Sequence, residues 1–252
     1  MGVREQIVGA ELESVVVDNP RSLDLTVDAH VHTGFAAGRD SVGVVVSAAD
    51  RAGLTAVTFA DQVGPDTTWL PAYADAVRRA RRRTEMTLRV AAEVEVVRQD
   101  GWLAWPADLS ELEAVSVAVS RLPLADGPAG PREVRALLAD GRITPERVAE
   151  LVITATVKGL ERASRYAPTQ LARPLILFSQ VGLDDNAVTD DILSVLTAAC
   201  RETGTAVEIS EAWRSPSPRL VERLREAGVP LVAASDARYA AEVGQWQYLR
   251  RV

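Results

Sequence analysis

The chain has 252 residues, of which 47% are hydrophobic and 25% charged, so it can bury a large globular core. Its net charge of −7 argues against a broad nucleic-acid-binding face, and we expect no nucleic-acid partner. A single cysteine, Cys200, excludes an internal disulfide, and no apolar run approaches the about 20 residues that span a bilayer; we expect a cytoplasmic protein without a membrane partner.

Short runs rich in Val, Ile and Leu alternate with helical patterns along the chain. The runs predict strands buried on both faces, at residues 23–28, 54–60, 88–97, 115–119, 174–179, 206–210 and 230–234. Helices are predicted at residues 41–51, 71–83, 144–165, 188–202 and 218–227, and residues 122–131 are predicted to form an irregular surface loop. This alternation implies parallel strands joined by crossover helices. We therefore predict an α/β fold with seven strands in a barrel, a single domain over residues 1–252 with its core at about residues 23–248.

The only two histidines stand at the end of the first predicted strand, in Asp28-Ala29-His30-Val31-His32. Their spacing of two residues puts both imidazoles on one face of a strand. At the C-terminal end of a barrel strand they would point into the mouth, where active sites form. Two neutral imidazoles are good ligands for Zn²⁺, Mn²⁺ or Fe²⁺, although such a pair also occurs at strand ends without a metal.

The segment at residues 28–57 resembles the opening of the polymerase-and-histidinol-phosphatase (PHP) metallohydrolases. It has their Asp-x-His-x-His-Thr run, a glycine-containing loop and a helix that ends in Ala52-Gly53-Leu54. Further pieces follow in the family's order, at residues 58–62, 91–95, 101–106, 119–123, 177–180, 207–210 and 235–238. The resemblance implies a distorted (β/α)7 TIM-like barrel of the PHP type, and a hydrolase that cleaves phosphomonoesters with clustered metals.

On this resemblance, the protein ligands of one metal are all retained. They are His30, His32, Glu93 and Asp236. Glu95 lies on the same strand face as Glu93 and is an alternative ligand. Glu208 fits either a structural hydrogen bond or a metal contact.

The histidines that the resemblance implies at two further metals are replaced. Their positions hold Ser120, Gln180, Gln62, Arg238 and a residue near Arg39. Serine and glutamine are poor substitutes for imidazole, and arginine does not ligate because it stays protonated. The sequence therefore predicts a reduced site with one divalent metal, Zn, Mn or Fe, or with none if the domain is inactive.

The remaining polar residues of the resemblance divide into two roles. Asp236 and Asp61 are predicted to be catalytic, Asp61 as a base or as a residue that orients the histidines. The predicted substrate-binding residues, which would hold an anionic group, are Arg39, Arg121, Arg238 and Gln62. Arg238 could instead pair with Asp61 or Glu95 and seal the pocket.

Two functions remain open from the sequence. The first is a PHP-like, single-metal hydrolase that acts on a small anionic metabolite, with a phosphorylated one implied by the resemblance. Loss of two metals weakens that implication, because phosphoryl transfer benefits from several cations. The second is a catalytically inactive barrel that serves as a binding or scaffolding subunit.

Overall fold

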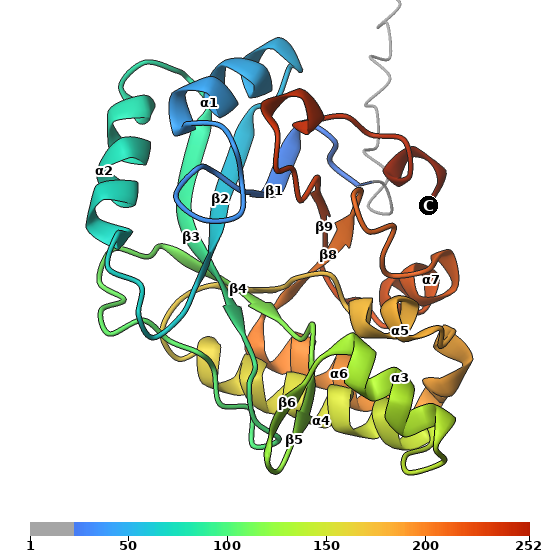
Figure 1. Ribbon diagram of the computed structural model, residues 1–252. Coiled ribbons are helices and arrows are strands. Elements are labelled where there is room, and N and C mark those ends of the chain that lie inside the picture. Colours follow the sequence, from blue (N-terminus) through green and yellow to red (C-terminus); the bar gives the residue numbers. More distant parts are fainter. Residues whose placement is uncertain (1–22) are drawn as a thin grey trace, which may run out of the picture.

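The computed structural model describes residues 23–252, and within them seven parallel strands surround a central axis (Figure 1). In sheet order the strands are β1 (Val27–Val31), β2 (Ala56–Val63), β3 (Thr87–Glu95), β4 (Ala114–Ala118), β7 (Thr169–Leu171), β8 (Ala206–Ser210) and β9 (Leu231–Ala234). The two outer strands meet beyond the end of β9, where Ala237 bridges Val31 and accepts a 3.0 Å hydrogen bond from the backbone N–H of His32. The predicted TIM-like α/β barrel is therefore confirmed, in a nearly closed form.

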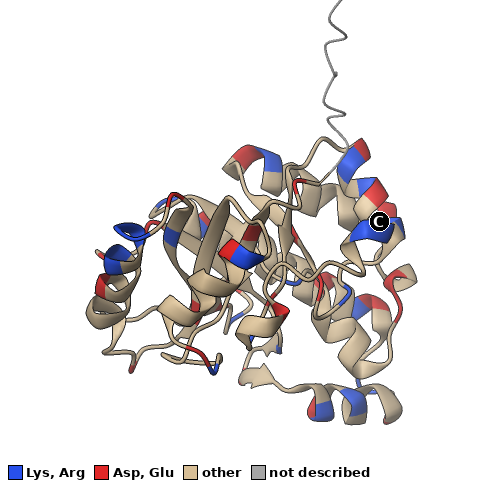
Figure 2. Ribbon diagram, turned by 90° about the horizontal axis from the view of Figure 1, so that it is seen from above, with Lys and Arg blue, Asp and Glu red and all other residues tan. Residues whose placement is uncertain are grey.

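Helices cover the outside of this ring, and they carry interspersed acidic and basic residues while the strands are largely uncharged (Figure 2). They are α1 (Val42–Arg51), α2 (Leu70–Arg81), α3 (Pro131–Ala139), α4 (Pro145–Ala163), α5 (Ile176–Val181), α6 (Asp190–Thr203) and α7 (Pro218–Glu226), with three short 3₁₀ turns at Asp185–Ala187, Ala240–Glu242 and Leu249–Arg251. Several of these helices have a hydroxyl side chain as N-cap, which accepts a hydrogen bond from a backbone N–H of the first turn. The N-cap residues are Ser41 for α1, Thr144 for α4 and Ser217 for α7. None of the helices within residues 23–252 is long and apolar enough to cross a membrane.

The first strand begins later than the sequence predicts. The Asp24 side chain accepts a 2.9 Å hydrogen bond from the Thr26 N–H and holds a turn there, so the extended backbone starts only at Val27. Asp28 and His30 consequently lie inside β1, and His32 directly follows it. The predicted single domain includes residues 1–22, which lie outside the described residues, so that boundary stays a prediction.

The predicted strand at residues 174–179 is wrong. That apolar run forms helix α5, and the strand that pairs with β4 and β8 is the preceding β7. The chain leaves the sheet at Arg173 and enters α5 after Leu175, which has a left-handed φ of 62°. An apolar run this short fits a buried helix as well as a strand, so periodicity could not separate them.

The loop predicted at residues 122–131 is also more ordered than expected. It contains an antiparallel hairpin of β5 (Leu122–Leu124) and β6 (Gly127–Ala129), and α3 follows directly. Gly127 has a φ of 125°, which suits the residue that begins the return strand. The hairpin extends from the end of β4, beside the barrel mouth (Figure 1).

Gly101 closes a turn against α4 and offers a test of packing in this wall of the barrel. Its φ is 77°, and an added Cβ would lie 2.4 Å from the carbonyl carbon of Lys158. Gly101→Ala is therefore expected to lower the free energy of unfolding by about 2–5 kcal/mol, from left-handed backbone strain and overpacking together. Gly141 has a φ of 65° but open space around it, so Gly141→Ala is the matched control and should cost only about 1–2 kcal/mol. Urea denaturation of both variants measures the difference, and equal losses would contradict the close packing at Gly101.

Candidate metal centre

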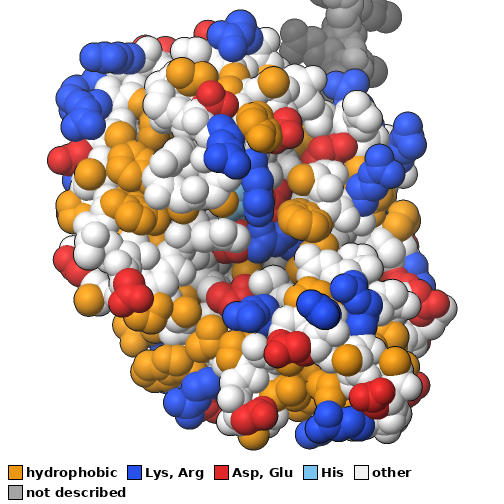
Figure 3. Space-filling view, in the orientation of Figure 1, with side chains coloured by type: hydrophobic (Ala, Val, Ile, Leu, Met, Phe, Trp, Pro, Cys, Tyr) orange, Lys and Arg blue, Asp and Glu red, His pale blue; other side chains and the backbone are white. Residues whose placement is uncertain are grey.

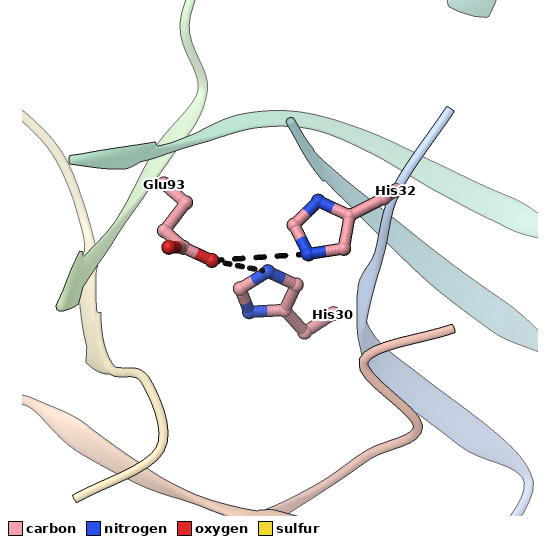
Figure 4. Close-up of side chains that lie close together, drawn as sticks. All are labelled: His30, His32 and Glu93. Atoms are coloured by element: carbon pink, nitrogen blue, oxygen red, sulfur yellow. Dashed lines mark ion pairs between the residues drawn. The ribbon is translucent and has the colours of Figure 1, made fainter. Parts of the chain in front are cut away.

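Two histidines and a glutamate meet at the C-terminal ends of the strands (Figure 4). The Nε2 atom of His30 lies 3.1 Å from Oε2 of Glu93, and Nε2 of His32 lies 3.8 Å from the same oxygen. The histidines come from β1 and the residue after it, and Glu93 comes from β3, so the parallel sheet brings distant segments together. All three side chains are buried, and their candidate ligand atoms lie within 4.8 Å of one another. The three residues could therefore hold a metal ion.

Asp236, the fourth predicted ligand, lies beside this cluster. Its Oδ1 is 2.9 Å from Nε2 of His32, and its backbone N–H donates a 2.9 Å hydrogen bond to the carbonyl of His30. Its φ of 54° is unusual for a residue other than glycine, and such strain persists only where the surrounding structure imposes it. The structure thus brings all four predicted ligands to one place.

Two atoms at the centre of this cluster have no hydrogen-bond partner. Nε2 of His30 and Oε2 of Glu93 are both buried, and they face each other without hydrogen-bond geometry. Buried polar atoms are almost always satisfied, because an unpaired one costs about 1–3 kcal/mol. A divalent cation between them would satisfy both, and a set of two imidazoles and two carboxylates suits Zn²⁺, Mn²⁺ or Fe²⁺. The residues present fit a metal.

A carboxylate stands behind each imidazole, within hydrogen-bond distance of His30 and farther from His32. Glu208 Oε1 lies 2.9 Å from Nδ1 of His30 and also accepts from Gln170 at 2.7 Å, which favours a proton on Nδ1 and leaves Nε2 free as a ligand. Oε2 of Glu208 has no partner, so neither sequence interpretation of this residue is excluded. Asp61 accepts hydrogen bonds from the backbone N–H and hydroxyl of Thr33, and its Oδ1 lies 3.7 Å from Nδ1 of His32. Both oxygens of Asp61 are therefore occupied in fixing the segment that carries His32.

Glu95 is turned away from the histidines. It accepts hydrogen bonds from the N–H and hydroxyl of Ser120, at 2.7 and 2.8 Å, and from the N–H of Arg121 at 3.2 Å. Glu93 and not Glu95 therefore meets the imidazoles, and Ser120 acts as a donor to Glu95. Burial raises the pKa of Glu95 to about 7.

This raised pKa predicts a dependence of stability on pH. A carboxyl whose pKa rises on folding contributes fully to stability at pH values below its unfolded-state pKa of 4.5. This contribution is lost as the pH increases through the folded-state pKa of about 7. Glu95→Gln keeps the contacts to Ser120 but removes the titration. Between about pH 5 and pH 7.5 the variant should gain stability relative to the wild type, as urea denaturation in the presence of a chelator would measure. A constant difference across this range would show that Glu95 titrates normally.

The predicted substrate-binding arginines are exposed. Among the described residues, the guanidinium of Arg238 makes no ion pair with Asp61 or Glu95. The backbone N–H of Arg238 donates a 2.9 Å hydrogen bond to the side chain of Glu242. Arg39 lines a groove of about 740 Å³ between α1 and α2. Figure 3 shows basic side chains gathered over the centre of the barrel on the face seen in Figure 1. A role in holding an anionic substrate stays a prediction for Arg39, Arg121 and Arg238.

The two glutamines lie in different surroundings. Gln62, predicted to bind substrate, donates a 3.1 Å hydrogen bond to Oε1 of Glu93 and so helps to fix that ligand. Gln180 does not occupy the strand end assigned to it. It lies on α5, where its backbone carbonyl accepts a 2.6 Å hydrogen bond from the side chain of Arg135 on α3.

The sequence did not predict the buried arginine of the site, Arg173. This side chain is 4% exposed, and its two terminal nitrogens donate to different carboxylates: one to Oε1 of Glu93, the other to Oδ2 of Asp236 at 3.0 Å. Arg173 follows β7, so it stands at the strand end for which the resemblance implies one of the lost histidines. Because the strand was predicted at residues 174–179, Arg173 was not recognised as a residue at a strand end.

These charges set the ionisation of the two carboxylates. Burial opposes the ionisation of Glu93, but the charges of Arg173 and the histidines hold its pKa well below the usual range. Burial also opposes the ionisation of Asp236, while the hydrogen bond from His32 and the charges of His30 and Arg173 lower its pKa to about 2. Both residues are therefore anionic near neutral pH, as metal ligands must be.

Comparisons with known proteins support the fold. No family model matches the chain, and no curated protein matches it. A similar solved structure is that of hisK from Listeria monocytogenes, provisionally assigned as a histidinol phosphatase. It has a TM-score of 0.69 and 13% sequence identity, over 87% of this chain and 97% of that chain. An HpcH/HpaI aldolase from Desulfitobacterium hafniense DCB-2 has a TM-score of 0.39 and 11% identity, over 82% of this chain and 85% of that chain. The chain thus has the barrel fold of a protein of the histidinol phosphatase type.

Proposed function

We propose that this protein is a metal-dependent hydrolase that acts on a small anionic metabolite through a site with one divalent ion. The observation that carries the proposal is the pair of unpartnered buried atoms, Nε2 of His30 and Oε2 of Glu93, with His32 and Asp236 beside them. A bound divalent ion would supply a Lewis acid and a nucleophilic water near neutral pH.

The chain's own residues would divide the remaining work. Glu93 and Asp236 would hold the ion with the histidines, and Glu208 favours the tautomer of His30 that leaves Nε2 available. Asp61 is better suited to orienting His32 than to accepting a proton, because both of its oxygens already accept hydrogen bonds from Thr33. The same argument weakens a proton-acceptor role for Asp236, whose two oxygens face His32 at 2.9 Å and Arg173 at 3.0 Å.

A phosphate ester is the substrate class that we propose first. The likeness to a provisionally assigned histidinol phosphatase supports it, as do the exposed basic side chains over the barrel centre (Figure 3). Guanidinium groups recognise phosphate oxygens with paired hydrogen bonds. Arg39, Arg121 and Arg238 are the proposed contacts.

The decisive experiment measures metal content and hydrolysis together. Protein purified without chelator should contain one equivalent of Zn, Mn or Fe by elemental analysis. It should hydrolyse members of a panel of phosphomonoesters, and a chelator should abolish this activity while the ion restores it.

The inactive barrel remains the alternative. Two results together would favour it: the protein takes up none of the three metals, and its melting temperature responds neither to chelator nor to added ion. A ligand that binds only the folded state must raise the melting temperature, so an unchanged value means that no ion binds. One equivalent of metal without hydrolysis of any ester would retain the metal site and reject the phosphoesterase assignment.

A further inference from the structure

Two carboxylates of the site, Glu93 and Asp236, each present one oxygen to the buried guanidinium of Arg173 and the other oxygen to a histidine. On one side, Glu93 and Asp236 present Oε1 and Oδ2 to Arg173. On the other side, their second oxygens face the histidines: Oε2 of Glu93 is 3.1 Å from His30, and Oδ1 of Asp236 is 2.9 Å from His32. A carboxylate that gives one oxygen to each of two cations is the arrangement of a bridged two-metal site. Here one of the two cations is part of the protein.

We propose that Arg173 permanently occupies the place of a second divalent cation and thereby limits the site to one metal. This inference rests on the proposed function, because it assumes that the histidine side holds an ion. It also assigns the ligand atoms: Glu93 and Asp236 bind that ion through Oε2 and Oδ1 only, since Arg173 holds their other oxygens.

The backbone supports a fixed position for this arginine. The last strand-like hydrogen bond of this segment joins the N–H of Ala172 to Val117 at 2.8 Å, and at Arg173 the chain takes a left-handed φ of 43°. Its carbonyl then accepts a 3.1 Å hydrogen bond from the N–H of Ile176 as α5 begins. A non-glycine residue adopts this conformation at a cost, so the contacts of the side chain must hold it there.

The chemistry of arginine explains why the substitution would be permanent. A guanidinium keeps its proton under all ordinary conditions and cannot become a ligand. Its planar fork reaches two carboxylates at once, which a lysine ammonium does less well. Charge neutralisation by Arg173 therefore does not depend on the supply of metal, whereas that of a second ion would.

Metal stoichiometry tests the proposal without reference to activity. Calorimetric titration with Mn²⁺ or Zn²⁺ should saturate the wild type at one equivalent. Arg173→His replaces the cation with a neutral donor and frees Oε1 of Glu93 and Oδ2 of Asp236, so this variant should saturate at two. Arg201→His is the matched control: Arg201 is exposed near the end of α6, so a histidine there should leave the stoichiometry at one.

Apo stability provides a second measurement. In the presence of chelator, Arg173→Gln should melt at a lower temperature than the wild type, because two buried carboxylates lose their cation. Saturating Mn²⁺ should narrow the difference. Two equivalents in the wild type would overturn the proposal for Arg173 and leave the metal site intact; no metal in the wild type would instead refute the proposed function. One equivalent in Arg173→His, together with an unchanged melting temperature of chelated Arg173→Gln, would also overturn the role of Arg173.

Discussion

His30→Ala is expected to abolish binding of the metal. The imidazole of His30 is completely buried, and its Nε2 is one of the two central atoms without a hydrogen-bond partner. Loss of a direct ligand should lower the affinity by more than the about 10–100-fold that accompanies loss of an outer-shell partner. Competition with a metallochromic chelator measures the dissociation constant, and elemental analysis measures the metal retained on purification.

The controls for this variant address folding and position. Alanine also removes one of the two partners of the buried Glu208, so circular dichroism must show that the variant keeps its secondary structure. Gln180→Ala is the matched control, because the resemblance assigns Gln180 to a ligand position and the structure places it on α5. Full retention of metal by His30→Ala would mean that the ion binds elsewhere.

The barrel could be predicted from sequence because strands buried on both faces have a strong compositional signal. The predicted strand at residues 206–210 coincides with β8, since this segment is apolar apart from Glu208 and Ser210 and is bounded by Gly204 and a loop. The signal failed at β7, which has only three residues and contains the polar Thr169 and Gln170. Tertiary pairing with β4 and β8 defines that strand, and no local pattern reports such pairing.

The same distinction holds for the site. His30 and His32 are close in sequence and share a strand face, so their proximity follows from spacing alone. Glu93 and Asp236 required the order of the family's motifs. Arg173 could not be placed, because its side chain enters the site only through a left-handed residue at the end of a strand that sequence reasoning displaced. A buried arginine that neutralises two carboxylates has no periodic signature.

Glu208→Gln is expected to weaken metal binding about 10–100-fold near pH 8 without removing the site. Oε1 of Glu208 lies 2.9 Å from Nδ1 of His30, and its charge makes the imidazole a stronger donor to a cation at Nε2. Glutamine can keep this hydrogen bond but not the charge. Competition titrations of the wild type and the variant, with the exposed Glu202→Gln on α6 as a control for the same chemical change, measure the difference.

The pH dependence separates this effect from a general distortion of the site. Burial opposes protonation of His30, but the charge and hydrogen bond of Glu208 raise the pKa of the imidazole well above its usual value. Protons therefore compete with the metal in the wild type, increasingly as the pH falls. Without the charge of Glu208 this competition weakens, so the affinities of wild type and variant should converge towards about pH 6. A difference that stays constant from about pH 8 to pH 6 would indicate that Glu208 acts on packing and not on the charge of His30.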